Sequence, residues 1–156
     1  GEKLYRKSMY TYWRRSSPMP NMLIFDAPTR EKCVVPRART NTPLQALVTL
    51  NDPVYIEAAQ ALARRMDAEG GETVESKVSF GVRACLVREP SSEEVERLKT
   101  LYETALERFS QMPEQAQMMA EQPLGKIPEG SHPAELAAWT VVGNVLLNLD
   151  EMFLKR

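Results

Sequence analysis

The residue types best suited to chemistry gather in one stretch, RARTNTPLQALVTLNDPVYIEAAQALARR, at positions 37–65. Its arginines could hold a carboxylate or a phosphate through paired hydrogen bonds, and its asparagines and acids could complete a polar binding loop. The same residue types also start and connect helices. A proline follows Thr42 and another follows Asp52, and proline is tolerated in a helix mainly in the first turn. We therefore interpret the stretch mainly as a joint that sets the angle between two helices.

The stretch itself is predicted to contain the starts of two helices, which would position its polar residues. Thr42, Pro43 and Gln45 match a capping box, in which the threonine caps the helix start and the glutamine side chain reaches back. Asp52 would cap the second helix, with Pro53 in its first turn, and the glycines of "EGG" would end that helix in a left-handed conformation. The predicted apolar positions of the two helices are Leu44, Leu47, Val48 and Leu50, then Tyr55, Ala59, Leu62, Ala63 and Met66.

An arginine-rich set precedes and enters the joint. It comprises Arg14, Arg15, Arg30, Arg37 and Arg39. Such a cluster can bind an anionic ligand, but it can equally pair with acids inside the chain. The acids within reach in sequence are Asp26, Glu31, Asp52 and Glu57. We favour internal pairing. Asn41 and Asn51, which flank the short helix, are expected to hydrogen-bond backbone in turns.

Cysteine and histidine chemistry has little support. Cys33, Cys85 and His132 are the chain's only thiols and imidazole, too few for a structural zinc site with four Cys or His ligands. No CxxCH motif for a covalent haem is present. A disulfide between the two cysteines and two buried free thiols both stay open. Cys85 falls on the apolar face of a predicted helix and is expected in the core. His132 precedes a proline at a helix start and is expected to be capping or exposed.

Composition predicts a folded, soluble chain. Of 156 residues, 43% are hydrophobic and 26% charged, and the net charge is −1. The charge is uneven, because residues 1–45 carry nine Lys/Arg against three Asp/Glu. We expect this basic arm to lie on the acidic remainder, so we expect no nucleic-acid partner. The longest apolar stretch, Leu136 to Leu149, is 14 residues long and includes two asparagines, so we expect no membrane insertion.

The remaining pattern predicts an all-α fold, an irregular bundle of about five helices with an extended N-terminal arm. Beyond the two helices of the joint, helices are expected at about 2–15, 72–88, 91–111, from 133 onward and, as one or two turns, at 113–121. The segment 21–40 lacks a helical period and is expected to be extended. The last helix is apolar almost all round and should form the buried centre. We expect one domain over 1–156, divided into the basic arm 1–41 and the helical body 42–156.

Four sequence blocks carry a family resemblance: "RKSMYTYWRR", "FDAPTRE", the joint itself and "HPAELAAWTVVGNVLLNLDEMFLKR". Together they resemble the C-terminal part of the DUF1553 domain, which closes large multi-domain proteins of planctomycetes. The resemblance runs from about 5 to 154, mainly by helix pattern over 67–130. His132 departs from the family, which more usually has Asp there. No catalytic residue follows from the resemblance. Its motif residues form the candidate binding surface: Trp13, Arg14, Asp26, Arg30, Arg39, Asn41, Gln45, Asn51 and Asp52.

The resemblance implies an exported protein in a periplasm-like compartment, of which this chain is a C-terminal fragment. It implies a cytochrome-c-like haem segment upstream, and no cofactor or metal in this chain. The expected function is a non-catalytic helical module that packs against the upstream domains of the same polypeptide. One alternative is part of a redox or hydrolytic active site shared with an upstream domain. Another is a carbohydrate-binding surface, with a glycan or a small anionic ligand as partner.

Overall fold

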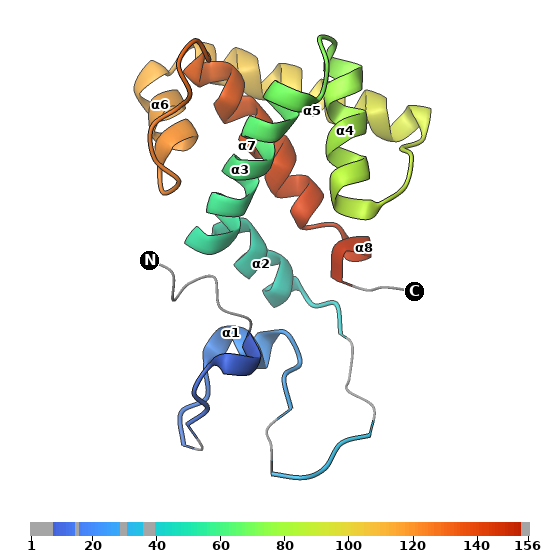
Figure 1. Ribbon diagram of the computed structural model, residues 1–156, viewed down its shortest axis with the longest axis vertical. Helices are drawn as coiled ribbons and strands as arrows, with labels where there is room; N and C mark the ends of the chain where they lie inside the picture. The colour runs from blue at the N-terminus through green and yellow to red at the C-terminus, as the bar shows by residue number, and fades with distance from the viewer. Residues whose placement is uncertain (1–7, 15, 29–30, 36–39, 154–156) are drawn as a thin grey trace. The chain divides into compact units, whose positions relative to one another are not determined.

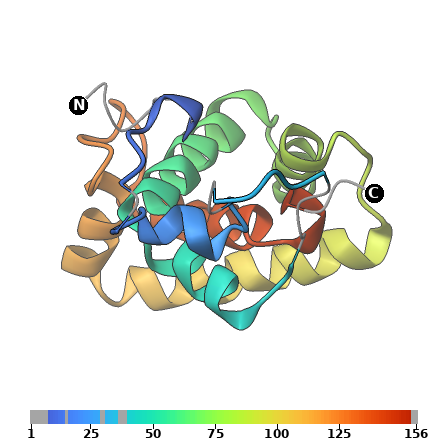
Figure 2. The same cartoon turned by 90° about the horizontal axis from the view of Figure 1, so that it is seen from below.

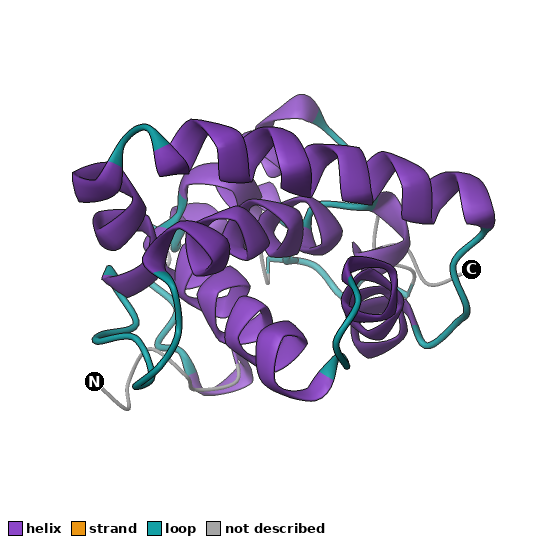
Figure 3. Ribbon diagram, turned by 90° about the horizontal axis from the view of Figure 1, so that it is seen from above, coloured by secondary structure: helices purple, strands orange, loops and turns teal. Residues whose placement is uncertain are grey.

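The computed structural model describes residues 8–14, 16–28, 31–35 and 40–153. Over these residues the protein is all-α, as predicted, with helices and loops and no strand (Figure 3). The elements are the 3-10 helix η2 (Ser8–Tyr10) and the α-helices α1 (Pro20–Ile24), α2 (Pro43–Asn51), α3 (Pro53–Glu69), α4 (Val74–Leu86), α5 (Ser92–Ser110), α6 (Pro113–Glu121), α7 (Pro133–Leu147) and α8 (Asp150–Phe153). Six of these α-helices have more than six residues, against the five or so predicted.

The contacts divide the chain into two compact units. The N-terminal unit is Gly1–Val48 and the helical unit is Thr49–Arg156. The division falls inside α2, a few residues after the boundary of 41/42 that the sequence suggested. Each unit is described by itself below.

Helix α7 forms the centre of the helical unit. It lies between α3 and α5, and α6 also packs on it (Figures 1 and 2). Nine of its fifteen residues are buried, which confirms that a helix apolar on all sides is the buried core of the bundle. Trp139 is its largest buried side chain and stacks on Tyr102 of α5, with ring centroids 4.0 Å apart.

Close approach of α3 and α7 depends on one glycine. A Cβ at Gly143 would lie 2.9 Å from the carbonyl oxygen of Ala59, closer than real side chains come. With no side chain at this position, the two helices meet backbone to backbone, and Ala59 is fully buried at the contact. Helices α3 and α7 are therefore held at a spacing that only glycine permits at position 143.

Short-range side-chain and backbone features mark the helix ends of the helical unit. Ser91 and Glu94 form the full capping box of α5, and Thr73 caps α4 by accepting from the backbone N–H of Ser76. Helix α3 ends at Glu69, and Gly71 takes the left-handed conformation with φ +90°. The predicted turns at 113–121 form the nine-residue helix α6.

Two predictions for the N-terminal unit were wrong. Within residues 8–14, the predicted helix at 2–15 is reduced to the single turn η2, because Thr11, Tyr12 and Trp13 are weak helix formers; its other residues lie outside the described chain. The segment predicted as extended contains α1, which begins at Pro20. A proline suits the first helical position because its missing N–H would have no partner there.

Candidate functional site

Asp26 follows the last turn of α1 (Pro20–Ile24), and its side chain bonds Thr40. The backbone N–H of Asp26 donates to Leu23 and that of Ala27 donates to Met22, the pattern of a Schellman motif, and Asp26 takes the left-handed position with φ +57°. Its carboxylate accepts the backbone N–H of Thr40 at 2.7 Å and the Thr40 hydroxyl at 2.8 Å. The backbone bond and then the side-chain bond from Thr40 lower the pKa of Asp26 below 3.8. Residues 26 and 40 are thus clamped together.

Gln45 ties this clamp to α2. Its Nε2 donates to the carbonyl of Ile24 at 2.8 Å and to the hydroxyl of Thr40 at 3.1 Å. Its Oε1 accepts the backbone N–H of Thr42 at 3.0 Å, and its own N–H donates to the Thr42 hydroxyl at 3.3 Å. The predicted capping box is confirmed, and one amide joins α1, the loop end and α2. Among the described residues of the N-terminal unit, Gln45 is the only one that is buried.

The other predicted surface residues fall into three groups. Trp13 is half-buried and Arg14 exposed in the N-terminal unit, where Asn41 is also exposed. Asn51, the last residue of α2, is exposed in the helical unit, and Asp52 accepts the backbone N–H of Val54 at 2.9 Å as the predicted N-cap of α3. Arg30 and Arg39 lie outside the described residues, as do Arg15 and Arg37. The predicted pairing of the arginine set therefore stays a prediction.

Large apolar side chains of the N-terminal unit are exposed. Val35 is fully exposed and Tyr12 is 85% exposed. The full set is Met9, Tyr10, Tyr12, Met19, Leu23, Val34, Val35, Leu44 and Leu47. Tyr10, Tyr12 and Leu23 are side chains of the types that are usually at least partly buried, yet here they are exposed. Exposed apolar side chains in this number are typical of a surface that another protein covers.

Gln60 in the helical unit, like Gln45 in the N-terminal unit, is a buried amide whose hydrogen bonds join separate segments. It is buried on α3, and its Nε2 donates to the carbonyls of Met119 at 2.6 Å and Gln122 at 2.7 Å. Its Oε1 accepts the backbone N–H of Leu124 at 3.0 Å. The end of α6 and the loop beyond it are thereby fixed to α3. Sequence reasoning missed this residue, although a glutamine on the apolar side of a helix was a visible signal.

Arg88 links two elements far apart in sequence. Its guanidinium donates to both carboxylate oxygens of Glu94, at 2.6 and 3.0 Å, and to both of Glu151, at 2.8 and 3.0 Å. The hydrogen bond from Arg88 is the main cause that lowers the pKa of Glu94 to about 2. Glu94 also closes the capping box of α5, so one arginine joins the start of α5 to α8. Nothing in the sequence placed Arg88 beside Glu151.

A third polar contact, within the helical unit, joins the end of α2 to α7 and its C-cap. The hydroxyl of Thr49 donates to the side-chain oxygen of Asn148 at 2.5 Å, and the Asn144 amide donates to the carbonyl of Leu50 at 3.5 Å. Thr49 and Asn144 are buried. Polar side chains therefore hold the end of α2 on α7, which explains Asn144 within an otherwise apolar helix and Asn148 at its C-cap.

The described residues offer few groups for catalysis. They contain no cluster of three or more His, Cys, Asp or Glu able to hold a metal ion. Both cysteines are free; Cys33 is exposed and Cys85 partly buried, and burial raises the pKa of Cys85. His132 stands at the N-cap position of α7, exposed and without a side-chain capping bond. In the part searched, no helix is both long and apolar enough to span a membrane.

The comparison with protein families agrees with the resemblance read from the sequence. The family model PSD1, described as a protein of unknown function (DUF1553), matches residues 1–102 of the 156. The chain belongs to the DUF1553 family. The match covers the N-terminal unit and extends into α5, so the DUF1553 model includes the clamp, Gln45 and the joint but not the C-terminal sequence block. No curated protein and no solved structure matches the chain significantly.

Proposed function

We propose that this DUF1553 chain is an interaction module, whose N-terminal unit binds another protein surface. The observation that carries the proposal is that the described residues of the N-terminal unit bury very little apolar surface. Among its described residues only Gln45 is buried, while nine large apolar side chains are exposed. A folded segment without its own apolar core gains stability when a partner covers it.

The hydrogen bonds of the motif residues support the same function. Asp26, Gln45 and Asp52 direct their side chains to backbone groups at a loop closure and at two helix starts. A catalytic carboxylate or amide would instead be expected to face a substrate pocket. These residues build a defined surface shape, which is what a binding module requires.

The partner we propose is the region that precedes this chain in its parent polypeptide. Following the resemblance, we propose that the parent polypeptide is multi-domain and exported, with a cytochrome-c-like segment upstream, and that any haem belongs to that upstream region. Interfaces between domains of one chain are commonly 600–1,500 Å² and partly polar. A short, largely exposed segment with arginines and aliphatic side chains suits such an interface.

The test is a calorimetric titration of the separately expressed preceding region into this chain, with a thermal melt of each alone and of the mixture. We expect saturable binding and a higher melting temperature for the chain in the complex. A single cooperative melt that is unchanged by the preceding region, with no heat of binding, would reject the proposal.

Carbohydrate binding is a second candidate, favoured by one observation. Tyr12 is 85% exposed and Tyr10 68% exposed, and exposed aromatic rings can stack on sugars. Titration of oligosaccharides against the chain, with Tyr12→Ala as the variant, separates this function from the first. A redox or hydrolytic site shared with an upstream domain stays an alternative, and it would depend on arginines that lie mostly outside the described residues.

A further inference from the structure

The junction between the end of α2 and the C-terminal end of α7, within the helical unit, contains a buried acceptor that no protein group satisfies. The side-chain oxygen Oδ1 of Asn144 is buried, and no donor of the described chain lies within hydrogen-bonding distance of it. Asn144 as a whole is only 7% exposed. Because nearly all buried side-chain polar atoms in folded proteins have a hydrogen-bond partner, this oxygen requires a donor.

The helix joint places a second acceptor beside this oxygen. The carbonyl of Leu50 lies in the last turn of α2, where the following turn of a helix would normally supply its donor. Here Pro53 carries no N–H, and the N–H of Val54 donates to the Asp52 side chain. The bond that the Leu50 carbonyl accepts from the Asn144 amide is 3.5 Å long, against about 2.9–3.0 Å for a typical N–H to oxygen bond. The Leu50 carbonyl is therefore only weakly satisfied.

Asn148 brings a donor to the same junction. It is the C-cap of α7, four positions after Asn144, so the two side chains project from neighbouring positions on one face of the helix. Its Oδ1 accepts the hydroxyl of Thr49 at 2.5 Å. The NH2 group of the same amide is thereby left as a donor at the junction.

We propose that a single buried water molecule binds at this junction, donating to Asn144 Oδ1 and to the Leu50 carbonyl and accepting from the Asn148 amide. A water molecule has two hydrogen atoms to donate, which match the two acceptors, and its oxygen matches the one donor. Buried waters in proteins typically make about three hydrogen bonds to polar groups that lack protein partners. This site belongs to the helical unit and does not depend on the binding surface proposed for the N-terminal unit.

Rotation of the Asn144 amide by half a turn does not remove the need for water. It would place Oδ1 against the Leu50 carbonyl, so that two acceptors would face each other. The amide nitrogen would then occupy the buried position without an acceptor. The orientation in which Nδ2 faces Leu50 is therefore the better one, and it leaves Oδ1 to the water.

The experiment joins a high-resolution crystal structure of the full chain to a water-selective NOE measurement in solution. We expect an ordered water within hydrogen-bonding distance of Asn144 Oδ1, and a cross-peak from water to the Asn144 side-chain amide. The matched control is the side-chain amide of Gln60. It is equally buried, but both ends of it bond protein groups, so it should show no such cross-peak.

The variant Asn144→Leu provides an independent readout, because it removes both polar groups of the amide and keeps a similar volume. We expect its melting temperature to fall by about 3 °C or more, since the water and the Leu50 carbonyl lose their partner. Gln117→Leu makes an amide-to-leucine change at an exposed position of α6 and should shift the melting temperature by less than about 1 °C.

Three results would each overturn the proposal. The first is a crystal structure in which no water, or a protein donor instead, lies beside Asn144 Oδ1. The second is an unchanged or higher melting temperature in Asn144→Leu, because replacing a truly unsatisfied acceptor by an apolar side chain relieves its cost. The third is an equal water cross-peak at Asn144 and Gln60, which would report general access of water to the helical unit.

Discussion

At the scale of single residues, two glutamine side chains join separate segments of this protein through hydrogen bonds. Gln45 and Gln60 each use both ends of the amide. The three side-chain hydrogen bonds of Gln60 reach groups 59 to 64 positions away. Gln45 bonds its near neighbours Thr40 and Thr42 and also the carbonyl of Ile24, 21 positions away. Both are buried. A buried amide with all partners in place fixes the backbone around it, whereas a missing partner leaves polar groups without hydrogen bonds.

The first prediction concerns Gln60. Gln60→Leu keeps a similar volume but leaves the carbonyls of Met119 and Gln122 and the N–H of Leu124 without their partner, so we expect the free energy of unfolding to fall by about 3 kcal/mol. Urea denaturation measures it. The control Gln117→Leu changes an exposed glutamine of α6 and should cost less than about 0.5 kcal/mol. Equal losses in the two variants would contradict the role given to Gln60.

The second prediction concerns pH and the clamp. The pKa of Asp26 is lowered in the folded chain by its bonds from Thr40, so the clamp contributes fully above the ordinary value of 3.8. That contribution is lost as the pH falls through the lowered pKa, because protonation removes the acceptor charge. In Thr40→Val the backbone bond stays and the hydroxyl bonds go, so the pKa of Asp26 should rise part of the way toward 3.8.

NMR titration of the Asp26 carboxyl measures this pKa directly. Thr104→Val serves as control, because the Thr104 hydroxyl donates only to the carbonyl of Thr100 within α5. An unchanged Asp26 pKa in Thr40→Val would show that the hydroxyl bonds do not stabilise the carboxylate.

At the scale of elements, helix ends are joined by side chains from distant parts of the chain. Arg88, two residues after the end of α4, forms ion pairs with Glu94 at the start of α5 and with Glu151 in α8. Helix α8 has only four residues, too few to be stable alone. Its place on the helical unit therefore depends on such contacts, and the ring of Phe153, 6.4 Å from that of Tyr55, provides another.

The third prediction follows from this arrangement. In Arg88→Gln the pKa of Glu94 should rise from about 2 toward 4.5, and amide hydrogen exchange of residues 150–153 should accelerate. The Glu94 contribution to stability is present above 4.5 and lost as the pH falls toward 2, so Arg88→Gln should narrow the difference in stability between pH 7 and pH 3.

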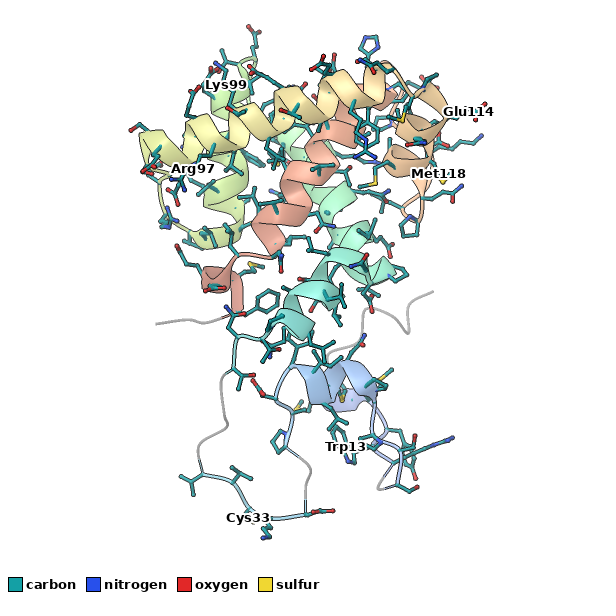
Figure 4. All side chains as sticks on the ribbon, turned by 180° about the vertical axis from the view of Figure 1, so that it is seen from behind. Trp13, Cys33, Arg97, Lys99, Glu114 and Met118 are labelled. Carbon is teal, nitrogen blue, oxygen red and sulfur yellow. The ribbon has the colours of Figure 1, made fainter. Side chains whose placement is uncertain are left out.

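The matched control is Arg97→Gln. Arg97 pairs with Glu93 one turn away on α5, and both side chains are more than 70% exposed, with Arg97 marked in Figure 4. We expect a change below about 0.5 kcal/mol and no effect on α8. Faster exchange of α8 in Arg97→Gln as well would point to a general charge effect instead of the Arg88 contact.

At the scale of the whole molecule, the two units differ in how they are stabilised. The helical unit has a contiguous apolar core that includes Trp139, Met66 and Leu146, while the described part of the N-terminal unit buries only Gln45. Local stability follows the number of buried apolar contacts. The two units should therefore open at different free energies.

The fourth prediction tests that difference. Limited proteolysis should cut first between residues 8 and 35 and leave a resistant fragment containing α3 to α7, identified by mass spectrometry. Addition of the preceding region should slow the early cuts if it covers the N-terminal unit. Early cuts within α3 to α7 would contradict the difference in stability between the units.

Local patterns predicted much of this fold because their causes are local. A proline after Thr42 or Asp52 places a helix start, and Ser91 with Glu94 places another, since capping involves residues three positions apart. The buried centre at α7 followed from an apolar helix surface alone. Helix α1 was missed because its five residues are too few for a periodic signal, and the helix at 2–15 was overpredicted because spacing of aromatics alone does not form a helix.

The sequence by itself determined the helical class, the main helix ends and the DUF1553 family, because composition, capping and motif are properties of neighbouring residues. Tertiary structure decided which motif residues meet. Asp26 and Thr40 are 14 positions apart, and Arg88 and Glu151 are 63 apart. Contacts over such separations depend on how helices pack, which no local pattern encodes. For that reason the clamp between Asp26 and Thr40 emerges only from the folded chain.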